Sequence, residues 1–200
     1  MKIEQMFLNQ NEFSRPGDKL YSVKAIVIHW TANPKSNAVA DRNFFENRKN
    51  GKTSYGSAHF IIGQDGRIIQ CIPTSEVAYH AGSSKDPNGK LPNEAGFIGC
   101  YTQEAKDRFG LKANGACRNP NYQSIGIELC PLDWDGNFSE ETMQSAVNLT
   151  ASLLTEFDLD INAITTHHNL VGWKDCPRLW TKKPGELFKF KESIKTILRG

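Results

Sequence analysis

The sequence predicts a single α/β domain whose central sheet is mixed but mostly parallel, with helices on its flanks and one long loop insertion. Short apolar runs rich in branched side chains are typical of buried strands, and they alternate with longer segments whose apolar residues recur at helical spacing. A length of 200 residues suits one hydrophobic core, so one domain over residues 1–200 is expected.

The first half of the chain contains a strand, a helix and a hairpin. The run KAIVIHW at residues 24–30 predicts a buried strand. AVADRNFFENRKNG at 38–51 has apolar residues at helical spacing, ends on glycine and follows Asn37, a plausible helix cap. SAHFIIG and RIIQCIP flank Gln64-Asp65-Gly66, which is a strong hairpin signal.

The second half supplies two further strands and two long helices. SIGIELC at 124–130 and AITTHH at 163–168 predict strands. The amphipathic segment from Ser139 to Phe157 predicts a helix that Ser139 caps. GELFKFKESIKTILR at 185–199 predicts the closing helix.

Residues 83–122 form the predicted insertion, rich in Gly, Pro, Asn and Lys, with one short helix expected around TQEAKDRF. A connection of this length is usually functional or disordered. It follows AYHAG and precedes the strand at 124–130, so we expect it to form part of a groove wall or to cover the groove. Cys100 and Cys117 within it are expected to stay free thiols, because cytoplasmic proteins rarely form disulfides.

Composition excludes several classes of function. The hydrophobic content of 38%, the charged content of 23% and the net charge of +2 are ordinary for a globular protein and argue against nucleic-acid binding. No apolar run is long enough to span a bilayer, so no membrane anchor is expected. MKIEQMFLNQNEF has no apolar signal region, which predicts cytoplasmic synthesis without a signal peptide.

The candidate chemistry gathers around THHNLVGWKDCPR at 166–178. Five cysteines without a CxxC pair argue against a structural zinc knuckle. Catalytic zinc sites usually take three ligands from His, Cys and carboxylate side chains. His29 ends a predicted strand, and one of His167 and His168 can join it with Cys176, since neighbours on a strand face opposite sides. The alternative is a set of hydrogen-bonded structural side chains.

Five segments in order, VIHWTA, SAHFII, AYHAG, SIGIELC and THHNLVGWKDCP, resemble zinc-dependent N-acetylmuramoyl-L-alanine amidases of the type-2 class. These are related to small phage lysozyme-amidases and to peptidoglycan recognition proteins. The resemblance covers nearly the whole chain outside residues 83–122. The opening SRPGDKL is most similar to endolysins and prophage autolysins of Gram-positive bacteria and their phages.

The resemblance implies one zinc ion per chain held by His29, Cys176 and the histidine eight positions before that cysteine, His168. His167 would then face away as a packing or hydrogen-bonding residue. It also implies that Glu128 is the general base and that Lys174 stabilises the oxyanion. A carboxylate within the apolar run SIGIELC supports a functional Glu128, because buried glutamate is rare unless paired.

Three further positions complete the comparison with the family. His80 matches a histidine that lines the groove, so substrate binding is expected, with a structural role as the alternative. His59 is expected to be structural. Ala58 stands where relatives carry a tyrosine that helps at the metal, and Tyr55 is nearby only in sequence.

The implied activity is hydrolysis of the amide between N-acetylmuramic acid and the L-alanine of peptidoglycan stem peptides. The implied setting is a phage or prophage lysin, made in the cytoplasm and acting on the cell wall after release, with no separate wall-binding domain. Two alternatives remain: a non-catalytic peptidoglycan-binding module and a regulatory protein-binding protein.

Overall fold

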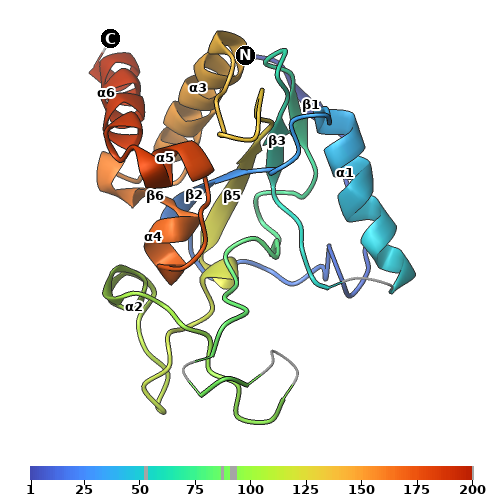
Figure 1. The fold of residues 1–200 in the computed structure, drawn as a ribbon, viewed down its shortest axis with the longest axis vertical. Coiled ribbons are helices and arrows are strands. Elements are labelled where there is room, and N and C mark those ends of the chain that lie inside the picture. The colour runs from blue at the N-terminus through green and yellow to red at the C-terminus, as the bar shows by residue number, and fades with distance from the viewer. Residues whose placement is uncertain (52–53, 87, 91–93, 200) are drawn as a thin grey trace.

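A computed structural model describes residues 1–51, 54–86, 88–90 and 94–199. One six-stranded sheet runs in the order β1-β4-β3-β5-β2-β6 (Figure 1). Its strands are β1 (Ile3–Gln5), β2 (Ala25–Trp30), β3 (Phe60–Ile62), β4 (Ile68–Gln70), β5 (Ser124–Leu129) and β6 (Ile164–Thr166). The helices are α1 (Ala38–Asn47), α2 (Gln103–Phe109), α3 (Glu140–Glu156), α4 (His167–Val171), α5 (Arg178–Lys182) and α6 (Gly185–Arg199).

The sheet is mixed and mostly parallel, which confirms the predicted fold class. β2 lies between β5 and β6 and is parallel to both. Only the β3–β4 hairpin is antiparallel among the described pairs, as the Gln64-Asp65-Gly66 turn predicts. Gly66 has a φ of 76°, a backbone conformation that favours glycine in this turn.

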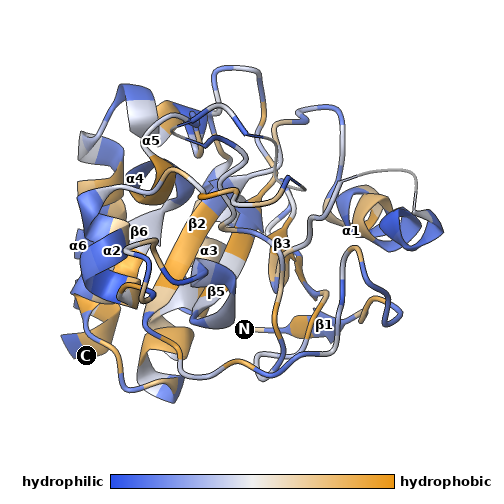
Figure 2. Cartoon of the chain, turned by 90° about the horizontal axis from the view of Figure 1, so that it is seen from below, coloured by the Kyte–Doolittle hydropathy of each residue, from blue (hydrophilic) through white to orange (hydrophobic). Residues whose placement is uncertain are grey.

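Alternation along the strands divides the core into two layers. Ile26 and Ile28 of β2 face the helices α3 and α6, which pack against each other (Figure 1). Val27 faces the opposite layer, where α2 and α4 lie, and Ile61 of β3 packs beside α1 in a separate cluster. Figure 2 shows the strands as the apolar centre between helices whose outer faces are hydrophilic. The second face is therefore flanked by α1 on one side and by α2 and α4 on the other.

The helices begin at the expected caps. The side chain of Asn37 accepts a hydrogen bond from the backbone N–H of Ala40 at the start of α1. Ser139 accepts one from Thr142 at the start of α3. Each cap satisfies an N–H group that the first helical turn leaves without a partner. The short helix expected in the insertion is α2.

The segment before Cys176 differs from the prediction. β6 ends at Thr166, and His167 is the first residue of α4, so the predicted strand through His168 is wrong at its end. Thr166 accepts a hydrogen bond from the N–H of Asn169 and caps the new helix. β1 and α5 were also not predicted.

Part of the predicted insertion packs against the rest of the domain. α2 packs against α4, and Phe109 is fully buried in that layer. The N–H of Cys100 donates to the carbonyl of Lys85 at 2.7 Å, which closes residues 86–99 into a loop. Residues 87 and 91–93 of the predicted insertion lie outside the described part of the chain. All five cysteines are free thiols.

Candidate metal centre and active site

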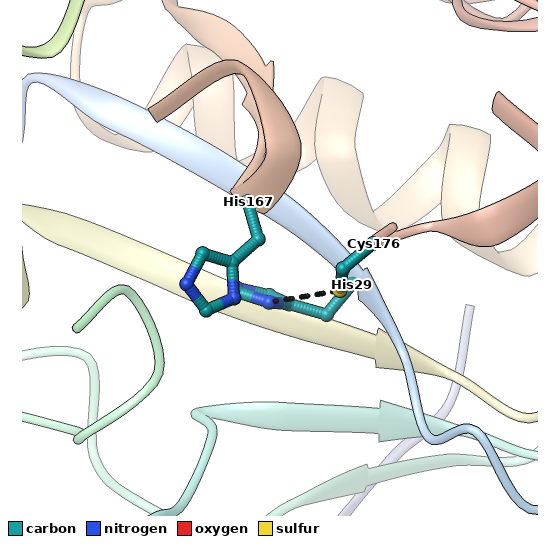
Figure 3. Close-up of side chains that lie close together, drawn as sticks. All are labelled: His29, His167 and Cys176. Carbon is teal, nitrogen blue, oxygen red and sulfur yellow. Dashed lines mark hydrogen bonds between the residues drawn. The ribbon is translucent and has the colours of Figure 1, made fainter. Parts of the chain in front are cut away.

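Three buried side chains meet at the carboxyl end of β2. His29 lies on β2, His167 begins α4 and Cys176 lies on the loop before α5. One ligand atom from each lies within 4.8 Å of the other two, and the His29 Nδ1 to Cys176 Sγ distance is 3.6 Å (Figure 3). Two imidazoles and a thiol form a donor set suited to zinc.

The structure places His167 in this cluster, where the family resemblance led us to expect His168. The Nδ1–H of His168 donates instead to the backbone carbonyl of Lys174 at 3.0 Å, and its ring is half-buried outside the cluster. The register explains the exchange: Ile28 pairs with Thr166 in the parallel ladder of β2 and β6. The residues that follow this pair, His29 in β2 and His167 after β6, therefore lie side by side at the same level of the sheet.

One ring nitrogen of His167 has no partner. Its Nε2 lies 3.0 Å from the carbonyl of Gly82, which only accepts, so Nε2 carries the proton. Its Nδ1 is buried and has no hydrogen-bond partner among the described residues. Burial, followed by the charge of Lys174, lowers the pKa of His167 to about 3. The ring thus presents a bare nitrogen to the cluster.

Burial also disfavours the charged forms of His29 and Cys176. Burial lowers the pKa of His29 well below its ordinary value, and the nearby His167, His80 and Lys174 lower it further. Burial, followed by the charge of Glu128, raises the pKa of Cys176 to about 12. A divalent cation would offset both effects, since thiolate is the form that binds metal. These donors therefore fit a zinc ion.

Glu128 lies beside the cluster on β5. It pairs with His29 in the parallel ladder, so both side chains leave the same face. The residue is half-buried as a whole, but its Oε2 is buried and has no hydrogen-bond partner in the described structure. Burial raises the pKa of Glu128 to about 8, against an opposing effect of Lys174, while Asp41 adds to the rise. Such a carboxyl exchanges protons near neutral pH.

A cavity of about 530 Å³ opens over these groups. Its walls include Trp30, Phe44, Trp173 and Lys174. Tyr55 also lines it, a position that the sequence did not predict, with its hydroxyl donating to Glu12 at 2.6 Å. Aromatic walls around a few polar groups are typical of small-molecule and polymer subsites.

The ends of the insertion form part of this cavity. Ser83 and Ser84 line it, and the indole N–H of Trp173 donates to Ser83 Oγ at 3.2 Å. The ammonium of Lys85 lies 4.8 Å from the centre of the Trp173 ring. Among the described residues of 86–99, none lines the cavity.

Both ring nitrogens of His80 are engaged inside the protein, which does not favour the expected substrate contact. Nδ1 lies 3.0 Å from His29 Nε2, and Nε2 lies 3.3 Å from the carbonyl of Ser124. His59 has the structural place expected of it, because its Nδ1 accepts from the N–H of Gly126 and its Nε2–H donates to the carbonyl of Glu76. Ala58 is fully buried and contributes no polar group.

Comparison with known proteins shows the family of this chain. The N-acetylmuramoyl-L-alanine amidase family matches residues 19–179. The chain belongs to this amidase family. A probable N-acetylmuramoyl-L-alanine amidase of Bacillus licheniformis is 32% identical over 198 residues, covering 99% of this chain and 48% of the relative. The amidase BlyA of Bacillus subtilis (strain 168) is 31% identical, with 97% and 47% covered. The chain thus spans about half the length of these relatives.

Solved amidase structures share the fold. The catalytic domain of XlyA superimposes with a TM-score of 0.66 at 26% identity, covering 97% of this chain and 99% of that domain. PlyL gives a TM-score of 0.65 at 18% identity, with 97% of each chain covered, and this shows likeness of fold alone.

The sequence did not predict two features of this cluster: His167 as a member, and His80 as the hydrogen-bond partner of His29. For His167 the signal was the HH pair itself, but choosing between its members needed the register of β6 against β2. For His80 no local signal exists, since 51 residues separate it from His29 in the chain.

Proposed function

We propose that this chain hydrolyses the amide between N-acetylmuramic acid and the L-alanine of peptidoglycan stem peptides, with one zinc ion as its cofactor. The observation that carries the proposal is the buried His29, His167 and Cys176 cluster with the unpartnered Glu128 carboxylate beside it. Membership of the amidase family supports the bond that is cleaved. The proposed partner is peptidoglycan.

His29, His167 and Cys176 would hold the zinc ion. When bound there, zinc polarises the scissile carbonyl and lowers the pKa of water. The buried orphan Nδ1 of His167 supports this ligand set, since an unpaired buried nitrogen is costly without a partner.

Glu128 is proposed as general base and then as general acid. Its Oε2 faces no donor in the described protein and is free to take a proton from the attacking water. The same carboxyl then delivers that proton to the leaving amine of L-alanine. A pKa raised by burial makes the second transfer easier than it would be for an exposed carboxylate.

Lys174 is proposed to stabilise the negative charge that develops on the carbonyl oxygen. It lines the cavity, and its charge reaches Glu128, His29 and His167, whose pKa values it lowers. A fixed positive charge at the site of developing negative charge is among the strongest catalytic devices.

The proposed place of action is the cell wall, reached after release from the cytoplasm, as for a phage or prophage lysin. Similarity to the solved structure of a mutant endolysin from Bacillus subtilis, at 27% sequence identity, supports this setting. Within the described residues, no helix has the length and apolar character needed to cross a bilayer.

The proposal is tested with purified protein and isolated Gram-positive cell walls. We expect about one zinc per chain and digestion that releases new L-alanine amino groups without new reducing sugar ends. Chelation should abolish the release, and added zinc should restore it. Wall binding without amine release would favour a non-catalytic module, and full activity in metal-free protein would refute the zinc mechanism.

A further inference from the structure

We propose that His80 is a positioning residue that holds the His29 ring in the tautomer with a bare Nδ1, and that Gly126 provides the space in which the His80 ring lies. The inference rests on the proposed zinc site and explains how the protein prepares one of its ligands. It assigns His80 a role within the protein rather than at the substrate.

The contacts of His80 with Ser124 determine which ring nitrogen of His80 carries the proton. His80 Nε2 lies 3.3 Å from the carbonyl oxygen of Ser124 and 3.3 Å from its Oγ. The Ser124 hydroxyl already donates to the carbonyl of Pro120 at 2.7 Å, so its oxygen is left to accept. Both atoms facing Nε2 are therefore acceptors, and Nε2 must carry a proton.

The proton on Nε2 decides the state of His29. A buried neutral imidazole carries one proton, and because that proton is on Nε2 the Nδ1 of His80 is bare and accepts a hydrogen bond. The donor is His29 Nε2 at 3.0 Å, which leaves His29 Nδ1 without a proton. That bare Nδ1 lies 3.6 Å from Cys176 Sγ, on the side of the cluster.

His167 is prepared in the same way by a different acceptor. Its Nε2–H donates to the Gly82 carbonyl, and its Nδ1 is bare. Ring nitrogens opposite a metal commonly donate to such outer partners, which fix the tautomer and the orientation of the ring. For His29 the outer partner is a side chain, and it can therefore be changed by mutation.

The position of the His80 ring is fixed from two sides. Asn121 Oδ1 accepts from the backbone N–H groups of His80 at 3.0 Å and Ala81 at 2.7 Å. On the other side, a Cβ at Gly126 would stand 2.5 Å from His80 Cγ and 2.7 Å from its Nδ1. Any side chain at residue 126 would displace the ring and its hydrogen bond to His29. This is a physical reason for glycine within the strand SIGIEL.

Nitrogen-15 NMR of histidine-labelled, zinc-free wild-type protein tests the tautomer directly. We expect His29 to show a protonated Nε2 and a bare Nδ1, and His80 to show the same pattern. A proton on His29 Nδ1 would overturn the inference. This readout does not depend on zinc, so it separates the inference from the proposed function: protein that binds no zinc yet shows this tautomer refutes the zinc site and upholds the role of His80.

Zinc affinity, measured by competition with a chromophoric chelator, supplies the second test. His80→Leu fills the site but removes the acceptor, and His80→Asn retains an oxygen near the place of Nδ1. We expect about 10–100-fold weaker zinc binding for His80→Leu and recovery of most of that loss in His80→Asn. Equal binding by both variants, whether as tight as wild type or equally weak, contradicts the inference.

Gly126→Ala tests the space around the His80 ring while leaving both histidines unmutated. We expect it to weaken zinc binding as His80→Leu does and to disturb the His29 tautomer in the NMR spectrum. Gly185→Ala is the matched control, because a Cβ there meets nothing within 4 Å. Wild-type affinity and tautomer in Gly126→Ala would show that the close approach at residue 126 has no bearing on the metal ligand. This variant also covers the case in which His80→Leu does not fold.

Discussion

His29 and Glu128 are register partners on the adjacent parallel strands β2 and β5, and their side chains leave the same face of the sheet. The proposed metal ligand and the proposed base are thus held by backbone hydrogen bonds rather than by loops. His167 lies next to this pair because it directly follows Thr166, the last residue of β6 that pairs with β2. A catalytic set on rigid strands keeps its geometry when the surrounding loops move.

The first prediction compares the two adjacent histidines. His167→Ala should weaken zinc binding by more than the roughly 10–100-fold expected when only a hydrogen-bond partner of a ligand is lost, because it removes a ligand itself. His168→Ala removes only a hydrogen bond to the Lys174 carbonyl and should bind zinc nearly as wild type. Metal analysis after dialysis measures both variants. Zinc loss in His168→Ala with zinc retained in His167→Ala would restore the assignment made from sequence.

The second prediction separates chemistry from metal binding. Glu128→Gln keeps the shape of the side chain but cannot take a proton, so kcat for amide cleavage should fall about 10²–10⁴-fold. Zinc content should stay near one per chain, because Glu128 lies outside the ligand cluster. Loss of zinc in this variant would make Glu128 a ligand or a support of one.

The third prediction concerns the stability of zinc-free protein. The pKa of Glu128 is about 8 in the folded state and near 4.5 when unfolded, so the folded state binds more protons between these values. The contribution of Glu128 to the free energy of unfolding therefore falls as pH rises through this range. The buried histidines are the same in wild type and in Glu128→Gln, so the difference between the two proteins isolates the contribution of the carboxyl.

Between pH 6.5 and 8, wild type should thus lose about 1–2 kcal/mol more than Glu128→Gln. Urea denaturation of both zinc-free proteins at several pH values measures the difference. Parallel pH dependence in the two proteins would mean that the carboxyl is already ionised at pH 6.5 in the folded state.

The fourth prediction concerns Lys174. Lys174→Met keeps the alkyl stem and removes the charge, so kcat should fall about 10²-fold with zinc retained. The pH range in which Glu128 changes the free energy of unfolding should also move to higher pH, since Lys174 lowers the pKa of that carboxyl. Lys174→Arg is the control that keeps the charge. Unchanged turnover in Lys174→Met would show that the lysine is only a surface residue.

The fifth prediction divides the insertion. The Cys100 N–H to Lys85 carbonyl hydrogen bond allows residues 86–99 to be replaced by an Asn-Gly turn. Because the described residues of 86–99 do not line the cavity, zinc content and wall digestion should match wild type. Trp173→Ala, which removes a cavity wall, should lower digestion instead. Reduced digestion by the shortened protein with zinc retained would assign the loop to substrate binding.

The sequence by itself determined five of the six strands of the described sheet, the long helices, and the caps of α1 and α3, because hydrophobic period and capping chemistry are local. It also identified His29, Cys176, Glu128 and Lys174 as candidate site residues, since their motifs are local too. These four lie around one cavity in the structure. The sequence predicted a mixed, mostly parallel sheet, but it did not predict the order of the strands in that sheet.

Tertiary structure alone decided between His167 and His168. Adjacent residues on a strand face opposite sides, so the choice depends on where β6 ends and how it pairs with β2. The Thr166 cap turns the chain into α4 at that point, which directs His167 into the cluster and His168 toward the Lys174 carbonyl. The His80 to His29 hydrogen bond also depends on tertiary structure, because it joins residues 51 apart in the chain and needs the space beside Gly126.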